Sequence, residues 1–414
     1  PTPGISSGVN ADGTLRDPST RWGGVMRKIE TTDFEASNIE FIQFWMMDPF
    51  ANGSLNNGTG GELYFNLGNM SEDILRDGHK SFENGLPAAT NNYTTATSNW
   101  GKYPVVQSIV NAFDNSPDSR TAQDVGLDGL SDADERNFFQ NSYLNRLATA
   151  YGTGSVAYKL ADADPSSDNY AYFLNPAYSD TGASPLNRYK RYNGQQGNSP
   201  ANGTIDGVQS TATTLPDMED INRDNNMEVG ENYWQYKINL RPSNMNVGQN
   251  YISDVIESPV RYANNTTGSI KWYQFKIPVR QPDKTIGEVD IQNIRFIRMF
   301  MKRFDSPVVL RFARLELLRG DWRTYLYSLL NPGEYSPTPE VPGETEFDIS
   351  AVSIEENGAR DPIPYVVPPG IVRERDITTT QTATLNEASL SMRVCKLADG
   401  DARGAYRNTQ LDMR

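Results

Sequence analysis

A nine-residue pattern that occurs twice constrains this fold more than any other feature of the sequence. The first copy is NIEFIQFWM (38–46), and the second, 255 positions later, is NIRFIRMFM (293–301). A second apolar run follows each copy, GELYFNL (61–67) and VVLRFARL (308–315). Runs rich in Val, Ile, Phe and Trp are typical of strands. Two such strand pairs predict two copies of one β-unit, or two halves of a nested one, and so a binding or scaffolding architecture.

Composition narrows the classes of partner. The 414 residues suffice for two or three cores, and the mean hydropathy of −0.61 is typical of a loop-rich, water-exposed protein. The formal net charge of −14 argues against nucleic acid, which needs a positive surface, but suits divalent cations. No run approaches the ~20 apolar residues of a membrane helix, so we expect no direct membrane span. The Gly/Ser/Asn/Pro-rich start and the uncapped YRNTQLDMR end predict a segment of a longer protein.

Catalytic patterns are weak, so the sequence predicts a protein that is not an enzyme. A Ser–His–Asp triad would have to use His79, the single histidine, which lies in the charged run RDGHK and is expected at the surface. The single cysteine, Cys395, is expected to be a half-buried structural thiol that forms no internal disulfide. The 52 acidic residues single out no carboxylate pair for glycoside hydrolysis, which stays open as a third alternative.

Alternating and periodic patterns predict a mainly β, α+β chain of jelly-roll-like β-sandwich units with short helices and long calcium-ordered loops. After an irregular segment (1–20), the first unit is expected at 21–330, with a large insertion at about 88–232. A Pro/Gly-rich linker (331–345) then leads to a second β unit (346–414) that is expected to be incomplete. The expected domain boundary is therefore the linker.

Two helices are expected before the second β region. The segment 70–85 has Ser71 as a candidate N-cap and ends at Gly85. The segment 132–152 follows Ser131, and Gly152 acts as its stop signal. Its apolar residues recur at helical spacing and predict one buried stripe: Phe138, Phe139, Tyr143, Leu144 and Leu147.

The segment PDMEDINRDNNMEVGENYW (216–234) resembles a calcium-binding EF-hand loop in its ligand spacing. Such a loop collects oxygen ligands at alternate positions and ends with a bidentate glutamate. Counted from position 1, the candidate ligands are Asp220, Asn222, Asp224, Asn226, Glu228 and Glu231. Position 6, normally Gly, is Asn225, a residue that tolerates left-handed backbone geometry. The alternative is an acidic, Asn-rich loop solvated by water.

The segment QDVGLDGLSDADE (123–135) is a second candidate metal loop, and it leads directly into the expected helix. Gly129 stands at position 6, as the EF-hand loop requires, whereas Gly126 at position 3 removes one ligand. The candidate ligands are Asp124, Asp128, Asp132 and Glu135. The alternative is that Asp132 and its neighbours only cap the helix and interact with its dipole.

Several long blocks resemble one family. They include the strand region, both acidic loops and the C-terminal run SLSMRVCKLADGDARGAYRNTQLDMR, and their ranges are 21–50, 61–87, 123–135, 187–200, 216–236, 352–371 and 389–414. Together they resemble the SprA/Sov family, the giant outer-membrane translocon of the type IX secretion system of Bacteroidetes, which is also required for gliding motility. The resemblance runs through nearly the whole chain.

The resemblance implies a pore for folded cargo and partners such as a PorV-like shuttle protein, secreted cargo and the rest of the translocon chain. Within such a translocon, we expect this chain to be a soluble region that caps, gates or lines the export route, or docks partners. The extracellular side is slightly favoured, because millimolar calcium would fill a weak site there. The leading alternative is a carbohydrate-binding or adhesive cell-surface β-sandwich protein, because tyrosine-rich sandwiches can stack glycans on exposed rings.

Overall fold

The computed structural model shows a mainly β chain, as predicted. It describes residues 8–51, 60–75, 77–80, 94–105, 113–114, 119–120, 123, 125–198, 203–205, 208–210, 214–215, 218–262, 264–320, 322–325, 346–358, 364–373, 375–376, 383–384, 387, 389–397 and 403–407. The chain divides into two compact units. Unit 1 contains 1–33, 44–277 and 281–314, and unit 2 contains 34–43, 278–280 and 315–414. The predicted linker (331–345) lies outside the described residues.

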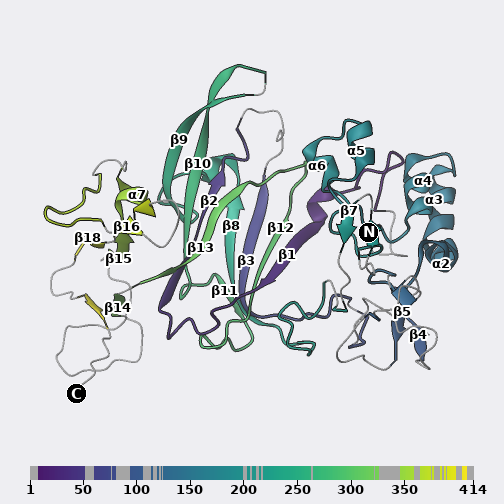
Figure 1. Cartoon of the computed structure of the whole chain (residues 1–414), viewed down its shortest axis with the longest axis horizontal. Helices are drawn as coiled ribbons and strands as arrows, with labels where there is room; N and C mark the ends of the chain where they lie inside the picture. The colour runs from purple at the N-terminus through teal and green to yellow at the C-terminus, as the bar shows by residue number, and fades with distance from the viewer. Residues whose placement is uncertain are drawn as a thin grey trace. The chain divides into compact units, whose positions relative to one another are not determined.

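Two antiparallel sheets form a sandwich (Figure 1). The five-stranded sheet has the order β1-β12-β3-β8-β11, with β1 Trp22–Lys28, β12 Phe296–Lys302, β3 Gly61–Asn69, β8 Asn232–Leu240 and β11 Lys284–Ile286. The four-stranded sheet has the order β13-β2-β10-β9, with β13 Phe312–Arg319, β2 Ile39–Met47, β10 Thr267–Pro278 and β9 Ile252–Arg261. Strands that are distant in the sequence thus meet in each sheet. The narrower jelly-roll assignment stays a prediction.

The sequence repeat corresponds to four strands that pair crosswise. The first copy gives β2 and then β3, and the second copy gives β12 and then β13. In the sheets, β12 lies beside β3, and β13 lies beside β2. Each copy therefore completes the sheet of the other, so the two copies form one nested unit.

Aromatic side chains fill the space between the two sheets. Phe44 of β2 stacks on Phe275 of β10 with ring centroids 4.9 Å apart, and it meets Phe65 of β3 at 5.2 Å and Phe312 of β13 at 5.5 Å. Leu63, Phe65 and Leu67, which alternate along β3, lie in this core and are fully buried. Burial of aromatic and aliphatic side chains is the main stabilising contribution to such a sandwich.

The predicted helix at 132–152 is confirmed as three consecutive segments: α2 (Asp132–Phe138), a π-helical turn (Gln140–Leu144) and α3 (Asn145–Tyr151). Ser131 holds the N-cap position, although its hydroxyl donates to Asp134 and caps no backbone N–H, and the chain turns at Gly152 with φ 80°. The predicted stripe packs against α4 (Val156–Ala163), with Phe139, Tyr143, Leu144 and Leu147 buried. Short helices follow at α5 (Pro176–Asp180) and α6 (Pro185–Arg188).

The predicted helix at 70–85 is wrong for the residues that the structure describes, 70–75 and 77–80, which contain no helical turn. Glu72 explains the difference. Its backbone N–H donates to the carbonyl of Glu228, and its buried carboxylate accepts from the N–H groups of Ile221 and Glu228. Glu72 is thus held by backbone and side-chain contacts with a distant loop, and local helix signals do not encode such tertiary contacts.

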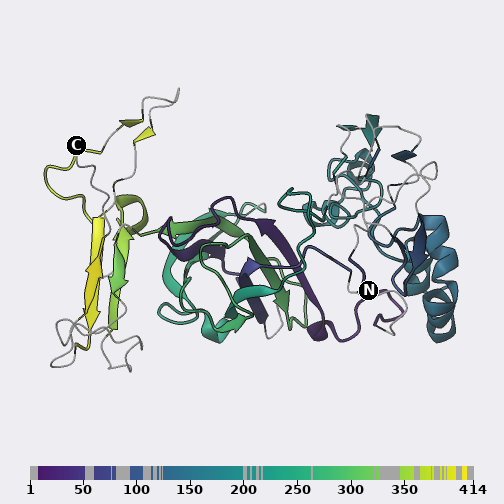
Figure 2. The same ribbon diagram turned by 90° about the horizontal axis from the view of Figure 1, so that it is seen from below.

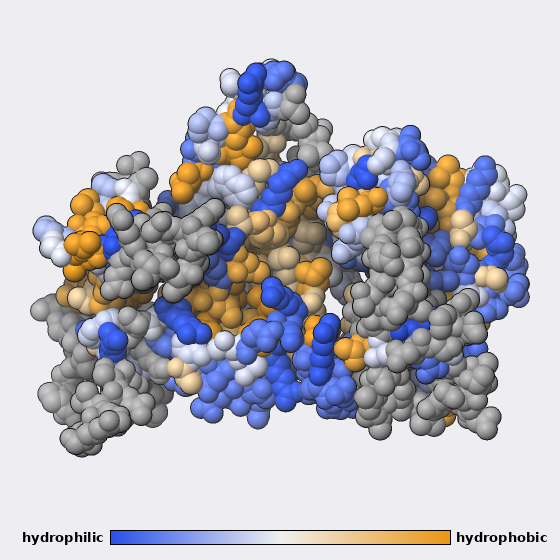
Figure 3. Space-filling model, viewed as in Figure 1, coloured by the Kyte–Doolittle hydropathy of each residue, from blue (hydrophilic) through white to orange (hydrophobic). Residues whose placement is uncertain are grey.

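The remaining short elements of unit 1 are η1 (Pro18–Thr20), β4 (Thr95–Thr97), β5 (Lys102–Pro104), β6 (Gly203–Ile205), β7 (Val208–Ser210) and η3 (Pro242–Asn244). Among the described residues, no helix is long and apolar enough to cross a membrane. Figure 3 shows apolar side chains gathered over the sandwich strands in this view, with hydrophilic residues along its lower edge.

Unit 2 is built on a two-stranded ladder, in which β15 (Glu346–Val352) pairs with β18 (Ser389–Cys395) along their whole lengths (Figure 2). Its other elements are β14 (Arg323–Tyr325), α7 (Ile354–Asn357), β16 (Arg375–Asp376), β17 (Ala383–Thr384) and β19 (Gly404–Tyr406). Cys395 lies half-buried at the end of β18, as expected. Two-stranded ladders are marginally stable by themselves, so other packing must support this one.

Candidate metal centre

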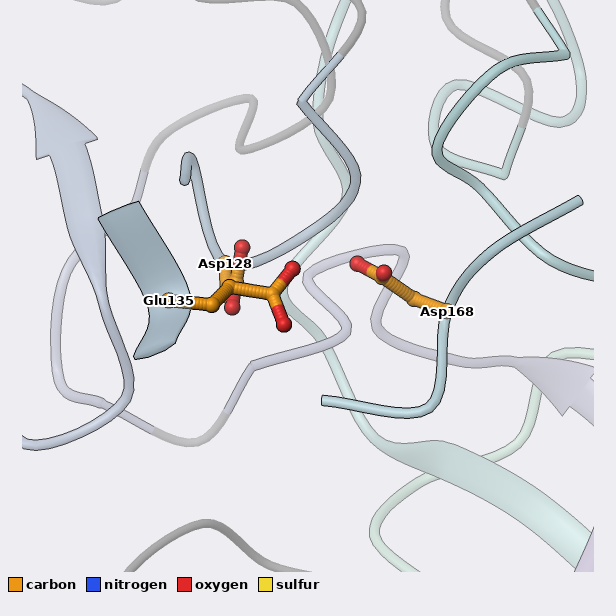
Figure 4. Close-up of side chains that lie close together, drawn as sticks. All are labelled: Asp128, Glu135 and Asp168. Carbon is orange, nitrogen blue, oxygen red and sulfur yellow. The ribbon is translucent and has the colours of Figure 1, made fainter. Parts of the chain in front are cut away.

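Three buried carboxylates of unit 1 converge beside the start of α2. The side chains of Asp128, Glu135 and Asp168 each offer one oxygen, and these three atoms lie within 4.8 Å of one another. Figure 4 shows the carboxylate of Asp168 pointing toward the other two from a separate stretch of chain. All three residues are less than a tenth exposed. Acidic side chains are seldom buried this completely unless they are paired or bind a metal.

Local backbone geometry places Asp128 and Glu135. The turn before α2 uses Gly126 at φ 66° and Gly129 at φ 68°, left-handed values that favour glycine. A Cβ at Gly126 would overlap Oδ2 of Asp168, so only glycine allows the carboxylate to approach the turn. Glu135 lies in the first turn of α2, on its buried side, whereas Asp132 and Asp134 of the same turn are exposed.

Backbone hydrogen bonds hold Asp168 from the opposite side. Its N–H donates to Oδ1 of Asp164 at 3.1 Å, and its carbonyl accepts from the N–H of Gln196 at 3.0 Å. The next residue, Asn169, forms an isolated parallel bridge with Gln196. These contacts position the Asp168 main chain, and its carboxylate faces the cluster (Figure 4).

Some carboxylate oxygens of the cluster have hydrogen-bond donors and others have none. Asp128 accepts from the N–H of Leu130 at 3.0 Å and from the hydroxyl of Ser166, whose N–H donates to Oε2 of Glu135 at 3.1 Å. Oε1 of Glu135 and both oxygens of Asp168 are buried without a hydrogen-bond partner. No ion pair among the described residues involves any of the three carboxylates. Buried polar atoms without protein partners indicate a bound water, a proton or an ion.

Burial and mutual repulsion raise the pKa of each member. Burial raises the pKa of Asp128 to about 6. Burial, followed by the charge of Asp128, raises the pKa of Glu135 to about 8. Burial, followed by the charges of Asp128 and Glu135, raises the pKa of Asp168 to about 9. Near neutral pH the cluster must therefore either retain protons or bind a cation.

The metal-free protein is expected to lose stability as pH rises. The unfolded carboxyls ionise near pH 4, whereas the folded cluster resists ionisation up to the pKa of about 9 of Asp168. A raised folded-state pKa means that the unfolded state releases protons first, so the stabilising contribution is complete below pH 4 and declines between pH 4 and 9. Urea unfolding in a chelator at pH 5, 7 and 8.5 measures the effect. The Asp168→Asn variant should show a smaller decline, and an equal decline in both proteins would contradict the assignment.

The second predicted metal loop contributes two of its four candidates to this cluster. Asp128 and Glu135 converge, Asp132 is exposed in the first turn of α2, and Asp124 lies outside the described residues. The third member, Asp168, was missed, because it lies 33 positions beyond Glu135 and outside the spacing of any single loop. The acidic, serine-rich run DADPSSDN (162–169) was the available signal.

The first predicted loop (220–231) is held by hydrogen bonds within the loop and by ion pairs to arginines, and its carboxylates do not converge. The carboxylate of Asp220 accepts from the N–H groups of Asp224 and Asn225, and Asn225 has the left-handed φ of 62° expected at position 6. Glu228 forms an ion pair with Arg295, and Glu231 forms one with Arg298 at 3.2 Å. Among the described acidic residues, only the cluster at α2 converges within 4.8 Å. Calcium at 220–231 thus stays a prediction, and Asn222 and Asn226 stay candidate ligands.

Comparison with known proteins gives one family match. A family model described as "Motility related/secretion protein" (SprA_N) matches residues 142–414. The match includes Asp168 and the 220–231 loop, and it begins after Asp128 and Glu135. No curated protein matches the chain.

Proposed function

The chain belongs to the SprA_N family of motility-related and secretion proteins, and from this premise we propose that it is a soluble region of an outer-membrane protein-export translocon. In this proposal it caps, gates or lines the route of secreted proteins, or docks partner proteins, in type IX secretion and gliding motility. The observation that carries the proposal is the family match across two thirds of the chain. The role is one of binding and support, without enzymatic turnover.

The surface charge supports a place on an export route. The formal net charge of −14 gives the chain a strongly acidic character. Like charges and a hydrated polar surface discourage non-specific adhesion of passing acidic proteins. A wall or gate with this surface would let folded cargo move past it. The proposed location is the outer membrane, with the extracellular side slightly favoured over the periplasmic side.

Strand β18 offers a surface for docking. Leu390, Met392 and Val394 alternate along the strand and share one face. Their side chains are 41%, 63% and 48% exposed, although they are the apolar residues of the strand. An apolar face on a two-stranded ladder gains stability when a further element packs on it. We propose that this face receives a PorV-like partner or another part of the translocon chain.

The variant Met392→Asp, introduced into the full translocon, tests the docking proposal. A charge at the centre of a desolvated contact is expected to weaken docking by about 2 kcal/mol, or roughly thirtyfold, and to reduce export of a reporter cargo. Export into the medium and co-purification of translocon components measure the two effects. Met392→Leu keeps the face apolar and serves as the matched control.

Stability separates lost docking from lost folding. Met392 is well exposed, so its replacement should change the free energy of unfolding by less than about 0.5 kcal/mol. Cys395 is the single cysteine of these 414 residues, so Cys395→Ser leaves Met392→Cys as the one thiol that this segment contributes to cross-linking. Normal export by Met392→Asp, together with no cross-link to any translocon component, would overturn the docking proposal.

One observation favours the alternative of a carbohydrate-binding or adhesive protein. Five aromatic rings cluster in 170–192, and two of them are well exposed, Tyr189 at 51% and Tyr192 at 40%. Sugars stack on exposed rings. Most of these rings are tilted or edge-on to one another, however, and they form no common plane. Glycan binding that disappears in Tyr189→Ala, combined with normal export, would favour this alternative.

A further inference from the structure

We propose that Asp128, Glu135 and Asp168 bind one calcium ion, which joins the start of α2 to the segment 164–169. This site differs from an EF-hand loop, because its third carboxylate comes from outside the loop that supplies the other two. The inference is independent of any role in secretion. Four observations support it. They are the distances between the oxygens, the buried oxygens without hydrogen-bond donors, the lack of an ion-pair partner among the described residues, and the chemistry of the ligands.

The distances between the three oxygens fit a calcium ion. Two ligands of one ion can be separated by at most twice the metal–oxygen distance, which is about 4.6–5.2 Å for calcium and about 4.2 Å for magnesium. The three oxygens lie within 4.8 Å of one another. The close approach of Asp168 depends on Gly126, where a Cβ would overlap the carboxylate. The backbone thus brings the groups near enough to share one ion.

The unsatisfied oxygens point to a bound ligand. Asp168 is 7% exposed, and neither of its carboxylate oxygens has a hydrogen-bond donor. Its main chain is held by hydrogen bonds to Asp164 and Gln196. Oε1 of Glu135, which is fully buried, also lacks a donor. An ion between the two groups would satisfy these three atoms together.

Among the described residues, no basic side chain supplies a counter-charge at the cluster. Three carboxylates are buried together, and no described lysine or arginine forms an ion pair with them. Burying unpaired charge is strongly unfavourable, and mutual repulsion adds to the cost. In contrast, Glu228 and Glu231 of the 220–231 loop are already paired with arginines. The need for a cation is therefore greater at Asp168.

The chemistry of the donors favours calcium over transition metals. The cluster offers carboxylate oxygens and the nearby hydroxyl of Ser166, and it contains neither imidazole nor thiolate. Oxygen-only donor sets select hard cations, and calcium accepts the irregular geometry of ligands from separate segments more readily than magnesium does. We expect a dissociation constant on the order of 10⁻⁵–10⁻³ M, in the range of sensor and extracellular modules.

Calcium titration of the full chain tests the proposal directly. Protein treated with a chelator and then dialysed should bind one calcium ion at this site in isothermal titration calorimetry, and magnesium should bind more weakly. At a calcium concentration a hundredfold above the dissociation constant, the melting temperature should rise by about 5 °C. Hydrogen exchange should slow at 164–169 and at Gln196. Absence of calcium binding by the wild-type chain would overturn the proposal.

Matched variants assign the site. Asp168→Asn keeps the shape of the side chain and should weaken calcium binding at least about 100-fold, since loss of mere supporting contacts already costs about 10–100-fold. In chelator the same variant should melt at a higher temperature than wild type, because repulsion within the cluster is reduced. Asp180→Asn makes the same chemical change at an exposed site and should leave binding unchanged.

A further variant separates the two candidate sites. Asp224→Ala alters the 220–231 loop and should leave the calcium dependence of the 164–169 exchange rates intact. If Asp224→Ala abolishes calcium binding while Asp168→Asn retains it, the ion is bound at 220–231 and the proposal fails. If Asp168→Asn does not fold, Glu135→Gln and the wild-type exchange data decide the question.

Discussion

Replacing Phe44 by alanine should lower the free energy of unfolding of the sandwich by about 3–5 kcal/mol. Phe44 is fully buried and contacts an aromatic ring on each of three neighbouring strands: Phe65 on β3, Phe275 on β10 and Phe312 on β13. Removing its ring leaves a cavity at the point where the two sheets meet, and the loss of ring contacts adds to the lost burial. Urea denaturation followed by near-ultraviolet circular dichroism measures the change.

Trp22→Ala is the control for the Phe44 prediction. Trp22 lies on the edge strand β1 and is 75% exposed, so its removal should change the free energy of unfolding by less than about 0.5 kcal/mol. A similar loss in both variants would mean that Phe44 is not at the centre of the core. A loss of under about 1 kcal/mol for Phe44→Ala would have the same meaning.

Gly126→Ala should destabilise unit 1 and weaken calcium binding together. The left-handed φ of 66° costs a non-glycine residue roughly 1–2 kcal/mol, and the new methyl group must also displace the Asp168 carboxylate. The total loss should therefore exceed the backbone cost alone, and calcium affinity should fall at least about tenfold, because a ligand is displaced. Thermal melting and calcium titration of the same preparation measure both effects.

Gly182→Ala isolates the backbone contribution in this comparison. Gly182 has a φ of 62°, close to that of Gly126, and a Cβ there would meet no atom within 4 Å. Its replacement should cost only the roughly 1–2 kcal/mol of left-handed strain and leave calcium binding unchanged. Equal effects of the two substitutions on stability and on calcium affinity would show that the contact with Asp168 has no importance.

The local patterns of the sequence predicted individual elements better than their partners. The repeat identified β2, β3, β12 and β13, because apolar alternation is a property of a few consecutive residues. Crosswise pairing of the two copies depends on contacts between distant strands, which no local pattern encodes. The same limit explains the error at 70–85, where N-cap and stop signals were present but the backbone of Glu72 bonds to a distant loop.

The candidate site shows this limit at the scale of single side chains. Asp128 and Glu135 were predicted because an EF-hand register counts positions along one loop. The same count selected Asp132, but the first turn of α2 directs it to solvent while Glu135 faces inward. Asp168 joins the cluster because its backbone bonds to Gln196 and because Gly126 has no Cβ to block its carboxylate. The spacing of residues along the sequence reveals neither contact. Buried oxygens without donors identified it only once the fold was known.

The crosswise pairing of the repeat also determines the order in which the chain can fold. Trp22 of β1 pairs with Lys302 of β12, and Glu62 of β3 pairs with the same residue from the other side. Contacts this distant in sequence carry a large loop-closure entropy and form slowly. During synthesis, β3 can pair with β8 once residue 240 has emerged, and β2 can pair with β10 once residue 278 has emerged, whereas β1 must wait unpaired until residue 302. The helices of 132–163 can form earlier, from local contacts. Before its partner strands emerge, the chain exposes unpaired strand edges, and in this period it would depend most on a chaperone.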